Sequence, residues 1–355
     1  MIEAGTHRIR KSFALACVLC LCRGYAEPTE TFTQNGLDYL RRQQADDGSF
    51  GQPQPHLKTG LAVLAMVSVQ TTLNPKDTEY LERATAFLIK TSETTGDLGD
   101  DMFRTESHSI ALLAMICSHE FLKDAKLKEE AAQRISRGLK YLMRLQDRSS
   151  SSSSRGGWRM EGRKGRTNDR RASAWALLTS QTAALYGMEV PKANVERGVR
   201  YLLGSFKTDA ESKDQIGGLS VDTLGLTVNL MSSMGGWALA RFDGKPSMLK
   251  KNIIWLEKHP QAWKGPNYFY STFFRLRALK FMDQPKLYTE TKKRISNQLQ
   301  DHQGSDGGLG FPPGNAQNTI AMGSVFTTAM GILIINVENS RLPGDEDYRV
   351  EPRFQ

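Results

Sequence analysis

The sequence predicts an all-α fold in which outer and inner helices alternate around a closed double ring. The first observation is a helix, turn and helix unit: GLDYLRRQQADDGSFG at residues 36–51 is followed by the apolar run LKTGLAVLAM at 57–66. Apolar residues at helical spacing precede a break at Asp47, Gly48 and Ser49. The second observation is that this unit recurs along the chain, which favours one repeat domain over two independent domains.

The copies are recognised by their outer helices and by the turns that follow. GLKYLMRLQ at residues 138–146 repeats the register of residues 36–44, and Gly157 and Trp158 follow after an inserted loop. Weaker copies keep an aromatic–leucine pair, and the last keeps a glutamine and a glycine turn: Phe87–Leu88, Tyr201–Leu202, Trp255–Leu256, and Gln303 with Asp306–Leu309. We therefore expect six outer helices, each followed by an apolar inner helix.

The first two pairs show most clearly which helices lie inside. The first pair is expected at about 33–68, and the second combines an outer helix near 80–90 with an inner helix at about 107–119. Both inner helices are almost wholly aliphatic. A helix that is apolar around most of its circumference is buried on several sides, as the inner member of a double ring would be.

The third pair carries an insertion. Its outer helix is expected at about 126–146 and leads into six consecutive serines, Ser149–Ser154, which predict a flexible low-complexity loop. Residues 155–171 hold seven basic residues against two acidic ones, so this segment is either a solvated loop or an anion contact. The inner helix starts near Ala172 and carries Trp175.

The last three pairs differ mainly in their inner helices. Pro191 opens the fourth outer helix in a first-turn position that tolerates proline. The fourth inner helix, after Gly217 and Gly218, is the most polar of the set and contains Asp222. The sixth inner helix is expected at 324–335, and the fifth gathers five aromatic residues: Tyr268, Phe269, Tyr270, Phe273 and Phe274.

The N-terminal residues do not belong to the repeats. Arg8, Arg10 and Lys11 precede an apolar run at 13–22, and small residues follow at the usual cleavage offsets. The run is too short to span a bilayer. We expect residues 1–26 to be a secretory signal peptide and residues 27–355 to form a single exported domain, periplasmic or secreted. The alternatives are an unprocessed N-terminus and a retained anchor.

Cysteine usage and charge limit the possible partners. Three of the four cysteines lie in the predicted signal peptide, so the mature chain would keep only Cys117 and could form no internal disulfide. Cleavage would lower the formal charge from +9 to +6, because it removes four basic residues and one acidic residue. A charge this mild gives no indication of a nucleic-acid partner.

The repeat pattern resembles that of squalene cyclases and protein prenyltransferases. In those proteins an aromatic–leucine outer helix, a glutamine and a Gly-x-aromatic turn recur around an α/α toroid. The resemblance covers essentially all of the mature chain. It implies an α/α toroid of six outer and six inner helices.

A closer resemblance is to exported bacterial proteins of the prenyltransferase/squalene oxidase repeat class, whose activity is generally unassigned. In these a histidine precedes the second inner helix, as His108 does, and an aspartate and a tryptophan bracket the third helix start, as Asp169 and Trp175 do. Arg171 stands where the pattern usually has serine. A Tyr-rich segment ending in threonine opens the fifth inner helix, as in Tyr268, Tyr270 and Thr272.

The catalytic motifs implied by the two enzyme families are missing from the sequence. Squalene cyclases protonate an alkene with an Asp-x-Asp-Asp motif, which does not occur here. The nearest acidic cluster, Asp97, Asp100 and Asp101, is expected to be solvated or to cap the next helix. Prenyltransferases bind zinc through Asp, Cys and His, but Thr327 stands at their histidine position. We therefore expect neither a metal nor a cofactor.

These observations favour a non-enzymatic role, in which the mouth of the ring binds a ligand or partner. The ligand would be a small molecule, lipid or saccharide, or the partner a protein. Loops and helix N-termini meet at one end of such a ring. The candidate ligand-binding residues are His56, His108, Asp169, Trp175, Asp222, Tyr268, Tyr270 and Thr272. Each also has a plainer interpretation as a helix cap or as core.

Two alternatives remain open. One is an enzyme acting on a terpenoid or a saccharide, because toroids also host carbohydrate enzymes. Its carboxylates would come from Asp100, Asp101, Asp169 and Asp222. The other is a purely structural scaffold that uses the Ser-rich basic loop as its interaction surface.

Overall fold

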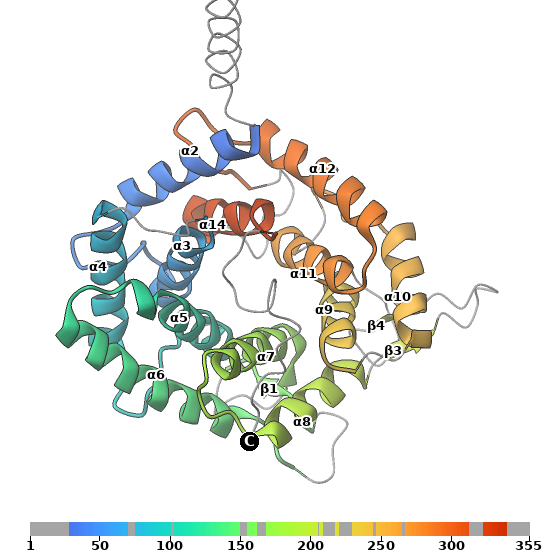
Figure 1. Ribbon diagram of the computed structural model, residues 1–355, viewed down its shortest axis with the longest axis horizontal. Helices are drawn as coiled ribbons and strands as arrows, with labels where there is room; N and C mark the ends of the chain where they lie inside the picture. Colours follow the sequence, from blue (N-terminus) through green and yellow to red (C-terminus); the bar gives the residue numbers. More distant parts are fainter. Residues whose placement is uncertain are drawn as a thin grey trace, which may run out of the picture.

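Two concentric rings of helices make up the protein (Figure 1). The computed structural model describes residues 28–69, 75–100, 103–149, 155–161, 168–204, 206–208, 217–219, 229–243, 246–264, 267–311 and 322–338. The predicted all-α toroid with six outer and six inner helices is confirmed within these ranges. The predicted signal peptide at 1–26, the serines at 150–154 and Asp222 lie outside them.

The helices alternate strictly between the two rings along the chain. The outer helices are α2 (Pro28–Gln43), α4 (Pro75–Thr91), α6 (Ala125–Leu145), α8 (Lys192–Leu203), α10 (Pro246–Lys258) and α12 (Pro285–Asp301). The inner helices are α3 (Pro55–Val69), α5 (Arg104–Ser118), α7 (Arg170–Leu185), α9 (Asn229–Ala238), α11 (Tyr268–Phe281) and α14 (Gly323–Ile335). The outer and inner helices of a pair therefore run in opposite directions.

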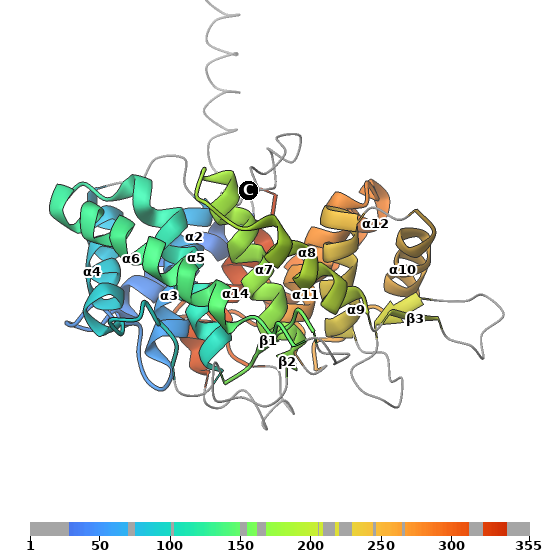
Figure 2. The same ribbon diagram turned by 90° about the horizontal axis from the view of Figure 1, so that it is seen from below.

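Short elements fill the connections. A 3-10 turn, η1 (His119–Phe121), follows α5, and a π-helical segment, η3 (Leu239–Asp243), follows α9. Two antiparallel ribbons lie before α7 and α9, and Figure 2 shows β1 and β2 at the lower edge, beside the start of α7. The strands are β1 (Trp158–Arg159), β2 (Asn168–Asp169), β3 (Phe206–Thr208) and β4 (Gly217–Leu219).

The inner helices are buried on all sides, as their composition predicts. Every residue from Leu57 to Ser68 in α3 is buried, and so is every residue from Thr105 to Ser118 in α5. Any polar side chain on the inner ring must therefore find its hydrogen-bond partners inside the protein. None of the described helices is both long and apolar enough to cross a membrane.

The Gly-x-apolar turn of the repeat joins each unit to the next. Gly48, Gly96, Gly156 and Gly307 have positive φ values between 82° and 94°. At Gly48 and Gly307 an added Cβ would lie 2.2 Å from a backbone oxygen of the neighbouring outer helix. Only glycine satisfies both the backbone conformation and this close approach.

The repeated glutamine completes the joint. The side-chain amide of Gln146 donates to the carbonyl oxygens of Gly156 at 2.8 Å and Asn194 at 2.7 Å. Gln303 donates in the same way to Gly307 and to Phe32 of α2, at 3.0 and 2.9 Å. The last repeat is thus joined to the first by the contact that links consecutive repeats, and this closes the ring.

Replacing Gln146 with leucine is expected to lower the free energy of unfolding by about 2–3 kcal/mol, because two buried carbonyl groups lose their donor. Chemical denaturation followed by circular dichroism measures the change. Gln133→Leu, on the exposed face of α6, is the matched control and should change stability by less than about 0.5 kcal/mol. Equal effects of the two substitutions would contradict this role of the repeated glutamine.

Candidate functional site at the centre of the ring

His56 lies at the start of α3, where it contacts the outer layer. Its Nδ1 is 2.7 Å from Oδ1 of Asp100, and its Nε2 is 2.9 Å from the hydroxyl of Thr91 in α4. The Asp100 carboxylate also accepts the backbone N–H groups of His56 and Leu57, and so caps α3. The imidazole therefore links two layers of the toroid and does not face the ring centre.

His108 is fully buried in α5 and uses both ring nitrogens inside the protein. Nδ1 accepts the N–H of Leu98 at 3.0 Å, and Nε2 lies 3.2 Å from the carbonyl oxygen of Gly138 in α6. The proton therefore sits on Nε2. Burial lowers the pKa of His108 to about 4, although the nearby Asp97 opposes this shift. Hydroxyl groups accept the corresponding turn N–H in three other repeats: Thr59, Ser173 and Thr328.

The acidic turn before α5 also has internal partners. Asp97 is buried and accepts hydrogen bonds from Tyr141 and from Arg104, each at 2.6 Å. Burial raises the pKa of Asp97, but these donors outweigh it and leave the pKa below its ordinary value. Asp97 is thus a buried structural contact and Asp100 is a helix cap. Asp101 lies outside the described residues.

Asp169 forms the N-cap of α7. Its carboxylate accepts the N–H of Ala172 at 2.8 Å, which satisfies one of the free donors of the first turn. Its backbone continues β2, which pairs with Trp158. Asp169 therefore stands at the end of the ring where the inner helices begin.

The two tyrosines that open α11 face opposite ways. The hydroxyl of Tyr268 donates to the side chain of Gln298 in α12 at 3.1 Å, which turns Tyr268 toward the outer ring. Tyr270, two residues later, donates to Oε1 of Glu106 in α5 at 2.6 Å and faces the ring centre. Thr272 is buried one turn after Tyr268.

Glu106, Arg171 and Tyr270 form a cluster that we call the central polar cluster. Nε of Arg171 lies 2.5 Å from Oε2 of Glu106, and the phenol of Tyr270 binds the other carboxylate oxygen. The guanidinium also lies over the ring of Phe103, 4.6 Å from its centroid. Glu106 and Arg171 come from the neighbouring inner helices α5 and α7, whereas Tyr270 comes from α11, which closure of the ring brings to them.

Glu106 and Tyr270 are buried, and the side chain of Arg171 is 15% exposed. Burial raises the pKa of Glu106, while the positive charge of Arg171 and the hydrogen bond from Tyr270 act in the opposite direction. The pKa of Arg171 is raised, because the attraction of Glu106 outweighs the effect of burial. Asp169 adds a further negative charge nearby. A buried ion pair of this kind adds little stability relative to apolar side chains of similar volume.

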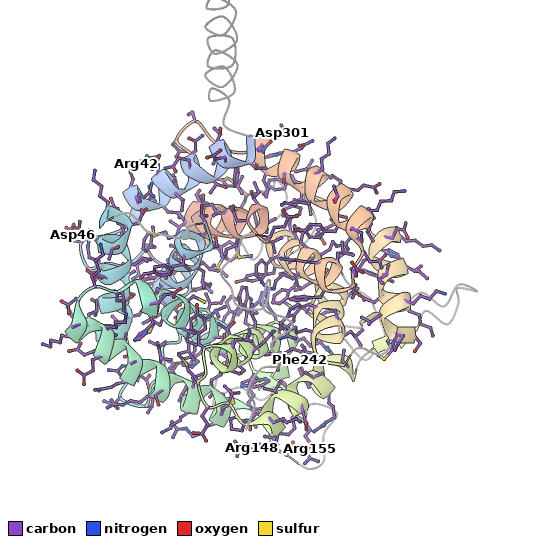
Figure 3. All side chains as sticks on the ribbon, viewed as in Figure 1. Arg42, Asp46, Arg148, Arg155, Phe242 and Asp301 are labelled. Carbon is purple, nitrogen blue, oxygen red and sulfur yellow. The ribbon has the colours of Figure 1, made fainter. Side chains whose placement is uncertain are left out.

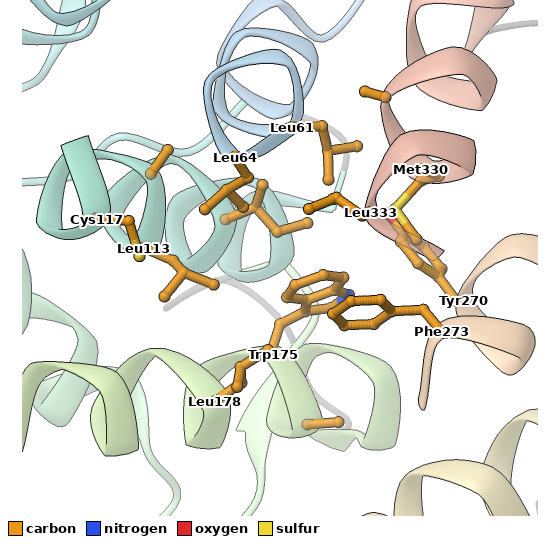
Figure 4. Packing of buried hydrophobic residues seen from close by; sticks show 14 of the residues in the cluster. Leu61, Leu64, Leu113, Cys117, Trp175, Leu178, Tyr270, Phe273, Met330 and Leu333 are labelled. Carbon is orange, nitrogen blue, oxygen red and sulfur yellow. The ribbon is translucent and has the colours of Figure 1, made fainter. Parts of the chain in front are cut away.

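An aromatic group adjoins the cluster. The indole of Trp175 stacks on Phe273 at 5.6 Å between centroids and meets Tyr270 edge to face at 5.6 Å. Figure 4 shows Trp175 and Phe273 projecting into the ring centre from α7 and α11, among leucines and Met330. The buried Nε1 of Trp175 has no hydrogen-bond partner within the described part of the chain.

The structure brings together only some of the predicted site residues. Trp175 and Tyr270 touch, and the charge of Asp169 acts on Glu106 and Arg171. The two histidines and Tyr268 serve contacts between helices. Sequence reasoning missed Glu106 as a site residue. It is a first-turn acid on a helix whose residues 110–117 are all apolar, so its burial could have been inferred.

Metal ligands do not converge in the described part of the chain. No three His, Cys, Asp or Glu side chains lie together there in an arrangement that could hold an ion. Thr327, at the prenyltransferase histidine position, hydrogen-bonds the carbonyl oxygens of Leu309 and Ser324.

Comparison with family models matches residues 3–221 and 251–347 to the prenyltransferase alpha-alpha toroid domain. A search of curated proteins found no match.

Solved structures with the same fold include enzymes of different classes. The GH76A alpha-1,6-mannanase of Salegentibacter sp. HEL1_6 is 11% identical with a TM-score of 0.57, covering 87% of this chain and 98% of the mannanase. The type II terpene cyclase MstE from Scytonema is 15% identical with a TM-score of 0.55, covering 88% and 98%. A protein from Actinoplanes is 14% identical with a TM-score of 0.53, covering 87% and 99%. At these identities the likeness concerns the fold alone.

Proposed function

Because the chain belongs to the prenyltransferase alpha-alpha toroid family, we propose that it binds a ligand at the end of the ring where its inner helices begin. The central polar cluster and Trp175 would hold this ligand. The observation that carries the proposal is the pair of Arg171 and the buried Glu106, beside a Trp175 N–H that has no partner among the described residues. Apolar side chains would stabilise the ring centre at least as well, so a binding role accounts for these groups.

The lining of the ring centre favours a largely apolar ligand. Leucines from several inner helices surround Trp175, whose indole meets Tyr270 of the central polar cluster. A saccharide presents many hydroxyl groups, each of which would need a partner in a buried site. An apolar molecule with one or two oxygen acceptors matches this lining better. Its oxygen would accept from Trp175 or from the Arg171 guanidinium.

The carboxylates near the site support binding over acid–base chemistry. Asp97, Asp100 and Asp169 each accept hydrogen bonds that hold turns or helix ends, and Glu106 faces a guanidinium. The donors of Asp97 hold its pKa below the ordinary value, so this carboxylate is a poor proton donor.

Export completes the proposal. The basic, apolar and small-residue pattern of residues 1–26 supports passage through a secretory pathway, with the toroid acting in the periplasm or outside the cell. The intact mass of protein recovered from an exporting host tests this directly. Loss of the first 26 residues is the expected result, and retention of them would contradict it.

Native mass spectrometry of residues 27–355, compared with the denatured mass, tests for a retained ligand. Trp175→Phe removes the N–H and keeps an aromatic ring, so the ligand affinity should fall about tenfold, as loss of one hydrogen bond of 1–1.5 kcal/mol predicts, and the bound fraction should fall with it. Trp255→Phe, in the outer helix α10, is the matched control and should retain the ligand. Equal occupancy in both variants would remove Trp175 from the site, and an empty wild-type protein would favour a structural scaffold.

A second candidate, an acid-catalysed enzyme, is favoured by one observation. Burial raises the pKa of Glu106, and the aromatic ring of Tyr270 lies beside it. The mannanase GH76A is described as inactive when two consecutive aspartates are replaced by asparagine, and MstE is described in complex with geranylgeranyl dihydroxybenzoate. Turnover of a polyprenyl substrate or an alpha-1,6-mannan that Glu106→Gln abolishes would establish this candidate. Absence of turnover of both would leave the binding role.

A further inference from the structure

A groove separate from the central polar cluster runs along the outer helix α6. It has a volume of about 790 Å³ and lies between α6 and the segment Met188–Pro191, which leads into α8. This volume falls within the range of about 300–1,000 Å³ that small-molecule sites usually have. The groove is lined by Thr95, His119, Ala132, Ile135, Ser136, Arg137, Leu139, Lys140, Met143, Arg144, Met188, Glu189 and Pro191.

The floor of the groove is apolar because of the spacing along α6. Ala132, Ile135, Leu139 and Met143 recur every three or four residues and so share one face of the helix. Met188 faces them from the opposite wall. Ala132 is exposed, whereas Ile135, Leu139 and Met143 are mostly buried in the core and present only their outer edges to the groove.

The rim of the groove is basic. Arg137, Lys140 and Arg144 line it, and Glu189 is the one acidic residue among the lining residues. None of the three cations forms an ion pair within the described residues; Arg144 contacts the carbonyl oxygen of Thr95 and the ring of Tyr141. Their charge is therefore available to a ligand.

The positive field continues beyond the rim. Figure 3 shows Arg148 and Arg155 projecting outward beside α8. Burial lowers the pKa of Arg197, and the positive charges of Arg148, Arg200 and Arg155 lower it further. Several guanidinium groups thus share this side of the toroid, with Glu196 near Arg200 as an acidic neighbour.

We propose that this groove binds an anionic amphiphile with a single alkyl chain. The chain lies along Ile135, Leu139 and Met143, and the anionic head is held by Lys140 and Arg144. A neutral lipid would leave the three rim cations without a counter-charge, and a polyanion would leave the apolar floor exposed to water. Only a molecule that carries both features matches the groove along its length.

Titration calorimetry with oleate tests the head-group contact. The double variant Lys140→Glu/Arg144→Glu should bind oleate at least tenfold more weakly than the wild type, because attraction becomes repulsion. The matched control Lys250→Glu/Lys286→Glu makes the same charge change on α10 and α12, across the ring, and should bind within twofold of the wild type. Oleyl alcohol, with the same chain and no charge, should bind more weakly than oleate to the wild type and equally to both variants.

A second variant tests the floor without disturbing the core. Ala132 is exposed on α6, so Ala132→Trp fills the groove from the solvent side and should abolish oleate binding while the circular dichroism spectrum stays unchanged. Trp175→Phe, at the ring centre, should leave oleate binding at the groove unchanged. Oleate affinity that is the same in wild type and Ala132→Trp, or no oleate binding to the wild type, overturns the proposal. Binding of polyglutamate in place of oleate also overturns it and assigns this surface to an acidic macromolecule.

Discussion

Replacing Arg171 with leucine is expected to lower the free energy of unfolding by about 3–5 kcal/mol. Glu106 would then be a fully buried carboxylate, and within the described part of the chain the hydroxyl of Tyr270 would be its one remaining hydrogen-bond donor. A charge removed from water without its counter-charge must either remain at high cost or take up a proton. Urea denaturation at pH 7, followed by circular dichroism, measures the loss.

The double variant Glu106→Leu/Arg171→Leu distinguishes the loss of the ion pair from the cost of leaving one buried charge unpaired. It should be more stable than Arg171→Leu alone, because it buries no unpaired charge and places two apolar side chains in an apolar ring. Arg200→Leu, at an exposed guanidinium of α8, should change stability by less than about 0.5 kcal/mol. If Arg171→Leu proves as mild as Arg200→Leu, the pair is solvated and the central polar cluster is not the desolvated site proposed above.

The titration of His108 alone is expected to lower the free energy of unfolding by about 3 kcal/mol as the pH decreases from 6.5 to 4. In the unfolded chain the imidazole takes up a proton near its ordinary pKa of about 6.5. In the folded protein it stays neutral until about pH 4, because it is fully buried. The unfolded state therefore binds the proton first, and each pH unit in this window costs about 1.4 kcal/mol.

The His108→Gln variant isolates this effect from the other titrating groups. Glutamine still offers an acceptor to the N–H of Leu98 and a donor to the carbonyl oxygen of Gly138, but it does not titrate. Protonation of carboxylates such as Asp97, whose pKa is lowered by its donors, also lowers the free energy of unfolding at low pH. This contribution is present in both proteins. Between pH 6.5 and 4 the free energy of unfolding of the wild type should therefore fall by about 3 kcal/mol more than that of His108→Gln. Parallel curves would show that the imidazole is solvated.

The repeat joints were predictable because they rest on local chemistry that recurs. Gln44, Gln146 and Gln303 occupy the same position before a glycine turn, and each amide bonds the carbonyl of that turn. The glycines need a positive φ and a bare Cα, so their identity follows from the turn itself. The resemblance to cyclases and prenyltransferases rests on these residues, and it extends to the fold.

The candidate site was only partly predictable. Trp175 and Tyr270 were among the predicted residues, but His56 and His108 were chosen for the same reason, their position near a helix start. In the structure both histidines face helix joints, because the side a residue faces depends on its angle around the helix axis and on its neighbours. Residue spacing gives the angle between two side chains on one helix. When the helix is apolar on all sides, however, nothing in the sequence shows which side faces the ring centre.

The sequence by itself determined the number of helices, their alternation between two rings and the glycine and glutamine joints, since each of these depends on interactions within or between adjacent repeats. Only the tertiary structure decided that Glu106, Arg171 and Tyr270 meet, because they lie on three inner helices that touch the centre only when the ring is closed. The α6 groove follows the same rule. Its floor could be predicted from the residue spacing of the single helix α6, but its opposite wall comes from Met188 in the next repeat.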